Sequence, residues 1–306
     1  MDILCVGHAA YDLIFSLDHF PVENTKYPVD SLVECGGGPA ANAAYLLAQW
    51  GVATGLAALV GDDPYGHAIV AEMDKIGADT SLLEVRPGFA TSLSAILVNV
   101  QGGSRTIINR TIKGDHVRLD PAKLAAPQPS VMLFDGHAVQ AALDAKKRYP
   151  NAKTVIDAGS LYEGTITLVD KVDYIVASEG FAKQLCGGAS CDTPAGQQQA
   201  IAALRKVAKP GAALVVTLGE RGLFYGVDGG VKHMPGLDVT AVDTTAAGDI
   251  FHGAFTYGVL KGMSLEENLR FSATTAAISV TRPGGRTSIP ALDEVLDFKG
   301  QWRSAR

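Results

Sequence analysis

One stretch decides the fold: Asp243-Thr244-Thr245-Ala246-Ala247-Gly248-Asp249-Ile250-Phe251. A short strand is predicted just before it, and a helix is predicted over Gly248–Lys261. The small residues between them permit a tight turn. The first backbone N–H groups of a helix have no partner within the helix and carry a partial positive charge. Small residues let an oxyanion approach those groups closely, so the stretch is suited to hold a phosphoryl group during transfer.

Asp249 stands at the start of this helix and has two interpretations. A carboxylate there could accept the proton of an alcohol that attacks the γ-phosphate of ATP. It could also be a helix cap, because Asp is among the favoured N-cap residues. Spacing alone does not separate the two.

Around this stretch, short apolar runs alternate with longer segments of helical period. The runs are nearly continuous in Val, Ile, Leu and Ala, as are strands covered by helices on both faces. This alternation predicts one α/β domain over residues 1–306, with a doubly wound, mostly parallel sheet and helices on both faces. The predicted strands are Ile3–Val6, Gly55–Val60, Val131–Phe134, Thr154–Asp157, Tyr174–Ala177 and Leu214–Thr217. The predicted helices are Pro39–Trp50, Tyr65–Ile76, Ala138–Arg148, Gly180–Leu185, Gly196–Val207 and Gly248–Lys261.

Two stretches interrupt the alternation. Residues 12–35 show little helical period, and Thr91–Asn99 with Arg105–Thr111 predicts a hairpin. Both are expected to form a small antiparallel sheet beside the main one. Such an insertion near the strand ends would make a β lid over a ligand cleft, formed by residues 12–35 and 91–111.

The composition limits the classes of function. The 306 residues are 47% hydrophobic and 19% charged, enough for a buried core, and the net charge is −6 without a block of like charge. A nucleic-acid groove or a basic membrane patch therefore has no support. The chain shows no secretory leader and no apolar run long enough to span a membrane, which favours a cytoplasmic protein.

The four cysteines are few and scattered. Cys186 and Cys191 could bind a metal or form a disulfide, but no matching Cys/His pair stands nearby. Reduced structural thiols are the expectation.

Three motifs carry a family resemblance. The stretch 243–251, followed by Gly253-Ala254-Phe255, resembles the C-terminal signature of the ribokinase-like (PfkB-type) carbohydrate kinases. The run 36–44 resembles their Gly-Gly-x-x-x-Asn element, and 61–66 matches their G-x-D-x-x-G. The matches extend from Gly7 to Ile289. The resemblance implies a ribokinase-like fold, Asp249 as catalytic base, and an anion hole formed by Ala246, Ala247 and Gly248, with Ala246 where many members have Gly.

The same resemblance implies a sugar site. Asp12 aligns with a carboxylate that grips two sugar hydroxyls, although it could also cap a turn. Cations over the cleft would suit an anionic group on the sugar. The implied substrate-binding residues are Asp12, Lys26, Tyr27, Gly37, Gly38, Asn42, Asn109, His137 and Asp249.

Among relatives, the chain looks most similar to bacterial sulfofructose kinases, which carry an Arg near the position of His137 that helps bind the sulfonate. This chain lacks that Arg, and a His is a weaker and pH-dependent partner for an anion. The substrate is therefore left open among a ketohexose, a pentose and an anionic sugar derivative. A nucleoside kinase, or a non-catalytic sugar-binding member, is the alternative on the same fold.

The nucleotide and cation positions also follow from the resemblance. It implies an ATP site at Ser178, Thr217, Gly219, Gly222 and Gly248, and a potassium site at Asp243, Thr245, Ser279, Arg282, Gly284 and Ser288. The Gly-rich run 217–222 also reads as a hairpin turn, and the last loop as a helix stop with a Pro-Gly turn. Glu179 is the candidate Mg²⁺ ligand, because the family's Asn-x-x-Glu is replaced here by Ser178-Glu179-Gly180-Phe181. Relatives commonly dimerise through the lid, and open sheet edges favour that.

Overall fold

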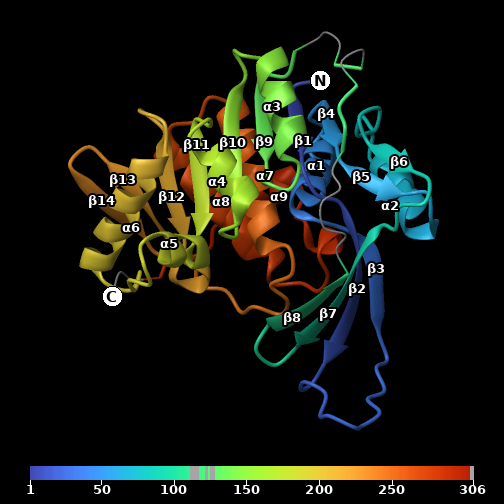
Figure 1. Cartoon of the computed structure of the whole chain (residues 1–306). Coiled ribbons are helices and arrows are strands. Elements are labelled where there is room, and N and C mark those ends of the chain that lie inside the picture. The colour runs from blue at the N-terminus through green and yellow to red at the C-terminus, as the bar shows by residue number, and fades with distance from the viewer. Residues whose placement is uncertain (111–116, 121–122, 125–127, 304–306) are drawn as a thin grey trace.

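A computed structural model describes residues 1–110, 117–120, 123–124 and 128–303. Within that part of the chain the main sheet has eight strands in the order β14-β13-β12-β11-β10-β9-β1-β4 (Figure 1). Strands β12 through β4 run parallel, and β13 and β14 complete one edge as an antiparallel hairpin. In sheet order the bounds are β14 Gly230–Met234, β13 Leu223–Val227, β12 Ala213–Thr217, β11 Tyr174–Ser178, β10 Lys153–Ala158, β9 Val131–Phe134, β1 Ile3–Val6 and β4 Thr54–Ala57. The predicted doubly wound, mostly parallel sheet is confirmed.

The alternation of side chains along β1 divides the core into two layers. Ile3 and Cys5 pack into one cluster with α1 and α7, whereas Leu4 and Val6 pack into a second cluster with α3 and α6. Both faces of the sheet are therefore covered, which explains why its strands are apolar throughout. The helices are α1 Pro39–Gln49, α2 Pro64–Lys75, α3 Val139–Arg148, α4 Glu163–Val169, α5 Glu179–Leu185, α6 Pro194–Val207, α7 Ala247–Leu260, α8 Leu265–Ser279 and α9 Leu292–Asp297, with 3-10 turns η1 Gly219–Arg221 and η2 Arg286–Ser288.

A second, four-stranded sheet projects from the main body (Figure 1). This lid sheet has the order β3-β2-β7-β8, with β2 at Ala10–Leu17, β3 at Leu32–Gly37, β7 at Ser92–Asn99 and β8 at Ser104–Arg110. Its outer pairs are antiparallel, as predicted, and its central pair β2–β7 is parallel. The two predicted insertions thus form one sheet, although Thr111, the predicted end of the hairpin, lies outside the described residues.

Several details differ from the sequence-based expectation, among them β6 (Glu84–Arg86), β14 and α9, which were not predicted. The predicted strand Gly55–Val60 divides into β4 and β5 (Leu59–Gly61), and β5 leaves the main sheet to pair with β6. Helix α4 was not predicted, because a seven-residue segment with Gly and Thr has little helical period.

The sequence also predicted that the chain has no membrane span and that its cysteines are reduced. No helix in the described part of the chain is long and apolar enough to cross a bilayer. Cys5, Cys35, Cys186 and Cys191 are free thiols.

Candidate active site

The loop Gly36-Gly37-Gly38 has no room for side chains. A Cβ on Gly37 would lie 2.0 Å from the Asp12 carboxylate, and one on Gly36 would lie 2.0 Å from the Arg286 guanidinium. Gly38 has a φ of 93° and precedes α1, where a Cβ would meet the carbonyl of His8 at 2.6 Å. The loop is therefore glycine because Asp12 and Arg286 pack directly against its backbone.

The base candidate Asp249 lies in the first turn of α7 and meets α1. Asn42 Nδ2 donates to Asp249 Oδ2 at 2.7 Å, across 207 residues of sequence. Burial raises the pKa of Asp249 to about 7, and the charge of Asp157 adds to the rise, whereas the Asn42 hydrogen bond, His252 and Arg105 oppose it. A carboxyl with a pKa near neutrality is suited to general base catalysis.

The turn before Asp249 has an unusual backbone. Ala246 adopts the left-handed conformation, with φ 59° and ψ 8°, at the N-cap of α7. This conformation is easiest for glycine, which accounts for the glycine that many members of the resembled family carry there. Next to it, a Cβ on Gly248 would meet no protein atom within 4 Å. The start of α7 therefore faces open space.

That space is a cavity of about 650 Å³. Gly248, Thr217, Gly219 and Gly222, four of the five predicted nucleotide-binding residues, line it together with Ala247. Apolar residues of α8 and of the segment before α7 form another part of its wall: Leu237, Val239, Ala241, Ala273, Ala276, Ala277 and Val280. The fifth residue, Ser178, is not in the lining, since its hydroxyl caps α5 by accepting from Phe181 N and donates to Gly159 O.

A lid residue reaches this cavity. Arg105 of β8 lines it, and its Nη1 donates to Thr244 Oγ1 at 2.8 Å. Thr244 in turn donates to Gly103 O at 2.8 Å. The tip of the β7–β8 hairpin is thus fastened to the loop that precedes α7, and a guanidinium stands beside the cavity. This position of Arg105 was not predicted, because a single Arg on a hairpin is typical of a solvated surface.

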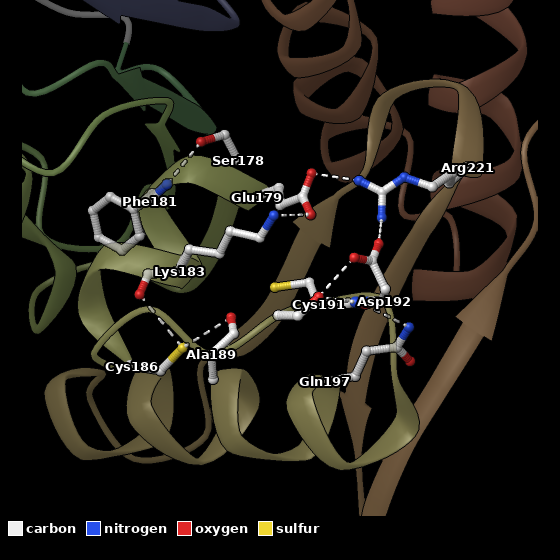
Figure 2. A network of polar contacts seen from close by, with 11 residues as sticks. Ser178, Glu179, Phe181, Lys183, Cys186, Ala189, Cys191, Asp192, Gln197 and Arg221 are labelled. Atoms are coloured by element: carbon white, nitrogen blue, oxygen red, sulfur yellow. Dashed lines mark hydrogen bonds and ion pairs between the residues drawn. The ribbon is translucent and has the colours of Figure 1, made fainter.

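The candidate magnesium ligand Glu179 is already paired with cations. Figure 2 shows its carboxylate between Lys183, whose Nζ lies 2.8 Å from Oε1, and Arg221, which also binds Asp192. Among the described residues no group of three or more His, Cys, Asp or Glu side chains could hold a metal ion.

The two segments predicted to bind potassium lie side by side. Val242 N donates to Val280 O at 2.7 Å, and the Asp243 carboxylate accepts from Thr245 N at 2.8 Å and from Gly284 N at 2.9 Å. Thr245 Oγ1 is buried and has no hydrogen-bond partner within the described part of the chain. Ser279 and Ser288 hydroxyls are bonded to nearby carbonyls, and the Arg282 side chain turns away to Glu294. If Arg282 binds a potassium ion, it must do so through its backbone, because its side chain is occupied by Glu294.

The predicted sugar-binding residues fall into three places. Asp12 pairs with Ser94, and Ser94 with Asn109, so the three side chains stand in a row on one face of the lid sheet. Lys26 and Tyr27 lie in the loop between β2 and β3, at the end of the lid remote from the main sheet (Figure 1), where Tyr27 Oη contacts His19 Nδ1 at 3.0 Å. They are not brought near Asp249 within this chain.

His137 lies at the end of β9, beside the Gly loop. Its ring centroid is 4.8 Å from that of His8 and 5.0 Å from that of Tyr162. Asp135 organises this corner: its carboxylate accepts from the backbone N–H groups of His8, Ala40 and His137, at 2.7, 3.2 and 2.9 Å.

A buried His–Asp pair at the start of α7 was also missed. His252 Nδ1 lies 2.6 Å from Gly248 O and 3.2 Å from Asp157 Oδ2, and its Nε2 lies 3.1 Å from Val176 O. All three neighbours are oxygen acceptors, so the ring ties the first turn of α7 to β10 and β11. The sequence signal was an Asp at the end of a buried strand, which Asp135 and Asp157 share.

The chain is similar over nearly its whole length to known kinases. The ribokinase of Haemophilus influenzae is 29% identical over 300 residues, 96% of each chain. The nucleoside kinase of Methanothermobacter thermautotrophicus is 26% identical over 312 residues, 98% of this chain and 96% of that one. A crystal structure from Agrobacterium tumefaciens, provisionally named a ribokinase, has a TM-score of 0.86 and 29% identity, with 96% of each chain covered.

The family model described as pfkB family carbohydrate kinase matches residues 1–292. That match takes in both glycine-rich elements, most of the cavity wall and the loop 279–288. The chain therefore belongs to the pfkB family of carbohydrate kinases, which are phosphotransferases.

Proposed function

We propose that this protein is an ATP-dependent sugar kinase in which Asp249 is the catalytic base. The observation that carries the proposal is the place of Asp249. Its carboxylate contacts Asn42, which follows the Gly loop, while the neighbouring Gly248 lines the cavity of about 650 Å³. An acceptor hydroxyl held by the loop and a phosphoryl group held at the start of α7 would therefore meet at one carboxylate.

Each residue of the site has a separate role in the proposed reaction. Asp12 and Asn42 bind and orient the hydroxyls of the sugar. Asp249 takes the proton from the attacking hydroxyl, and the N–H groups at the start of α7 bind the oxygens of the transferring group. Arg105, which lines the same cavity and whose charge acts on Asp249, places a positive charge beside the transferring group. Closure of the lid excludes water from the reaction.

The nucleotide is proposed to occupy the cavity, with its phosphates toward Gly248 and its base toward the apolar wall of α8. Mg²⁺ supplies charge neutralisation to the ATP phosphates. Glu179 does not fit as a direct ligand while Lys183 and Arg221 hold its carboxylate. ATP oxygens and water then remain as the main magnesium ligands.

A potassium ion fits the loop at 279–288. The buried, unpartnered Thr245 Oγ1 and the carbonyls of the loop would hold it, and Asp243 would balance its charge. Such an ion would supply fixed positive charge behind the anion hole. The supporting observation is the orphaned Thr245 oxygen within the described residues.

An uncharged ketohexose or pentose is the proposed substrate class. Asp12, which is buried, and Asp249 already place two carboxylates at this site, and Arg286, the buried cation beside the Gly loop, is already paired with Glu72. An anionic sugar would add a further negative charge to this corner. Lys26 lies at the remote end of the lid in this chain.

The function is tested by a substrate screen with ADP release as the readout. Ketohexoses, pentoses, their phosphates, sulfofructose and nucleosides are offered in turn with ATP. Uncharged sugars are expected to react best, and Asp249→Asn is expected to abolish turnover while leaving ATP binding intact. Turnover confined to nucleosides would replace the sugar proposal by the nucleoside kinase one. Turnover retained by Asp249→Asn would remove the base assignment.

We also propose a homodimer through the lid. Strand β8 forms one edge of the lid sheet, and its Ile107 and Ile108 side chains are 44% and 61% exposed. An open apolar edge favours pairing with a second copy. Light scattering after size exclusion should give twice the chain mass, and Ile108→Lys should shift the protein towards the monomer. A monomeric parent protein would contradict the proposal.

A further inference from the structure

Behind the Gly loop lies an ion pair between the buried Arg286 and the partly exposed Glu72. Arg286 in η2 is 4% exposed, and its Nη1 lies 2.6 Å from Oε2 of Glu72 on α2. The guanidinium carbon stands 5.0 Å from the centre of the Tyr45 ring. Its Nη2 has no hydrogen-bond partner among the described residues. Burying a charged pair is costly in free energy, so such a pair is weak support for stability and points instead to a positional role.

The pair determines which way the Asn42 amide faces. Arg286 Nε donates to Asn42 Oδ1 at 3.1 Å, and Asn42 Nδ2 donates to Asp249 Oδ2 at 2.7 Å. A guanidinium has no acceptor, so it must meet the carbonyl end of the amide. The NH₂ end is then the one directed at Asp249. In the flipped amide, the carbonyl oxygen would face the carboxylate and repel it.

The Arg286–Glu72 pair also holds the Gly loop in place. Both Glu72 carboxylate oxygens accept from Gly36 N, at 2.9 and 3.1 Å. The Arg286 guanidinium packs directly against the backbone of Gly36, since a Cβ on Gly36 would lie 2.0 Å from Nη1 of Arg286. One ion pair therefore connects the end of lid strand β3, helix α1 and the base on α7, which are far apart in sequence.

We propose that Arg286, held in place by Glu72, is a positioning residue for the reaction. It fixes the Asn42 amide so that Asn42 donates to Asp249, keeping the carboxylate ionised and aimed at the acceptor hydroxyl. The inference rests on the proposed role of Asp249 as base. It goes beyond that role by assigning the orientation of the base to two residues that do not contact it.

The charges around both groups define what a pH experiment reports. Asp249 is faced by Asp157 from β10, His252 from α7 and Arg105 from β8, besides Asn42 from α1. Burial raises the pKa of Asp12 on β2 and of Tyr45 on α1, and the charge of Glu72 on α2 adds to both rises, whereas the charge of Arg286 opposes them. Because the Asn42 hydrogen bond lowers the pKa of Asp249, its loss should move the acid limb of kcat/KM to higher pH.

The first experiment compares Arg286→Gln and Arg286→Lys with the parent enzyme. We expect kcat to fall about tenfold to a hundredfold, the loss expected when a charge-assisted hydrogen bond is removed. The sugar KM should change less, and the acid limb should shift upward. The matched control is Glu294→Gln, which breaks the exposed Arg282–Glu294 pair beside the same loop and should leave kcat unchanged. Thermal unfolding identifies any variant that fails to fold.

The second experiment is a double-mutant cycle with Asn42→Ala. If Arg286 acts through the amide, Arg286→Gln should have little further effect on kcat or on the acid limb in the Asn42→Ala background. Multiplicative losses would overturn the inference, as would a folded Arg286→Lys or Arg286→Gln enzyme with the parent kcat and pH profile. Failure of the base assignment is separate, because it would appear as turnover by Asp249→Asn.

Discussion

Replacing Gly248 by alanine should separate catalysis from stability. Gly248 is the second residue of α7, and a Cβ there would meet no protein atom within 4 Å. Alanine is favoured over glycine in a helix by up to about 1 kcal/mol, less at a helix end, and no clash opposes this gain. The Gly248→Ala protein should therefore be as stable as the parent or slightly more stable.

The same methyl group projects toward the cavity that Gly248 lines. A phosphoryl oxygen must come within hydrogen-bond distance of the N–H groups at the start of α7, and the methyl group would hold it away. Losing one donor of an anion hole costs about a hundredfold to a thousandfold in kcat. We expect a loss of that size in ADP release, with the melting temperature unchanged or raised.

Gly180→Ala is the matched control. Gly180 is also the second residue of a helix, α5, and its Cβ would meet only Ser178 Oγ, at an ordinary 3.6 Å. Gly180 is not among the cavity residues, so the variant should gain helix stability without losing turnover. The reasoning is refuted if Gly248→Ala keeps full activity, or if it loses activity only because it unfolds at a lower temperature than the parent.

Three further changes test other parts of the site. In folded Asp249 the pKa, about 7, lies above the ordinary range of an aspartate, so the stabilising contribution of this residue is complete below about pH 4 and is lost as pH rises through 7. Asp249→Asn should therefore raise the melting temperature at pH 8 but hardly at pH 4, and equal shifts at both would contradict the raised pKa. Arg105→Met should lower kcat at least about tenfold, since it removes the lid's charge beside the cavity, and an unchanged kcat would remove Arg105 from the reaction. Gly37→Ala should displace Asp12, raising the sugar KM about tenfold while ATP affinity stays constant, as isothermal titration with each ligand can check.

The expectations that depended on local sequence were the most successful. The apolar runs gave the parallel strands, because a strand buried on both faces must be apolar along its whole length. The turn into α7 was equally local: small residues followed by Asp249 gave a helix start with its N–H groups exposed. Ala246 shows what remained hidden, since its left-handed φ of 59° is a property of the folded turn.

The contacts of side chains whose partners are distant in sequence were not predicted. Glu179 is the candidate magnesium ligand, and the fold places Arg221 against its carboxylate (Figure 2). Arg105 was assigned only to a hairpin, yet it reaches Thr244, 139 residues away. Neither contact has a local signal, because each depends on how two loops meet.

The sequence by itself determined the class of fold, the family resemblance and the position of the base candidate, because these follow from hydrophobic period and from consecutive residues. Only the tertiary structure decided how the base is held. Asn42 lies 207 residues from Asp249 and 244 from Arg286, and Glu72 lies 214 residues from Arg286. The orientation of one amide depends on these contacts. It is set by the packing of α1 against α7 and η2, and by Glu72 of α2, which binds Arg286, rather than by any local preference of the chain.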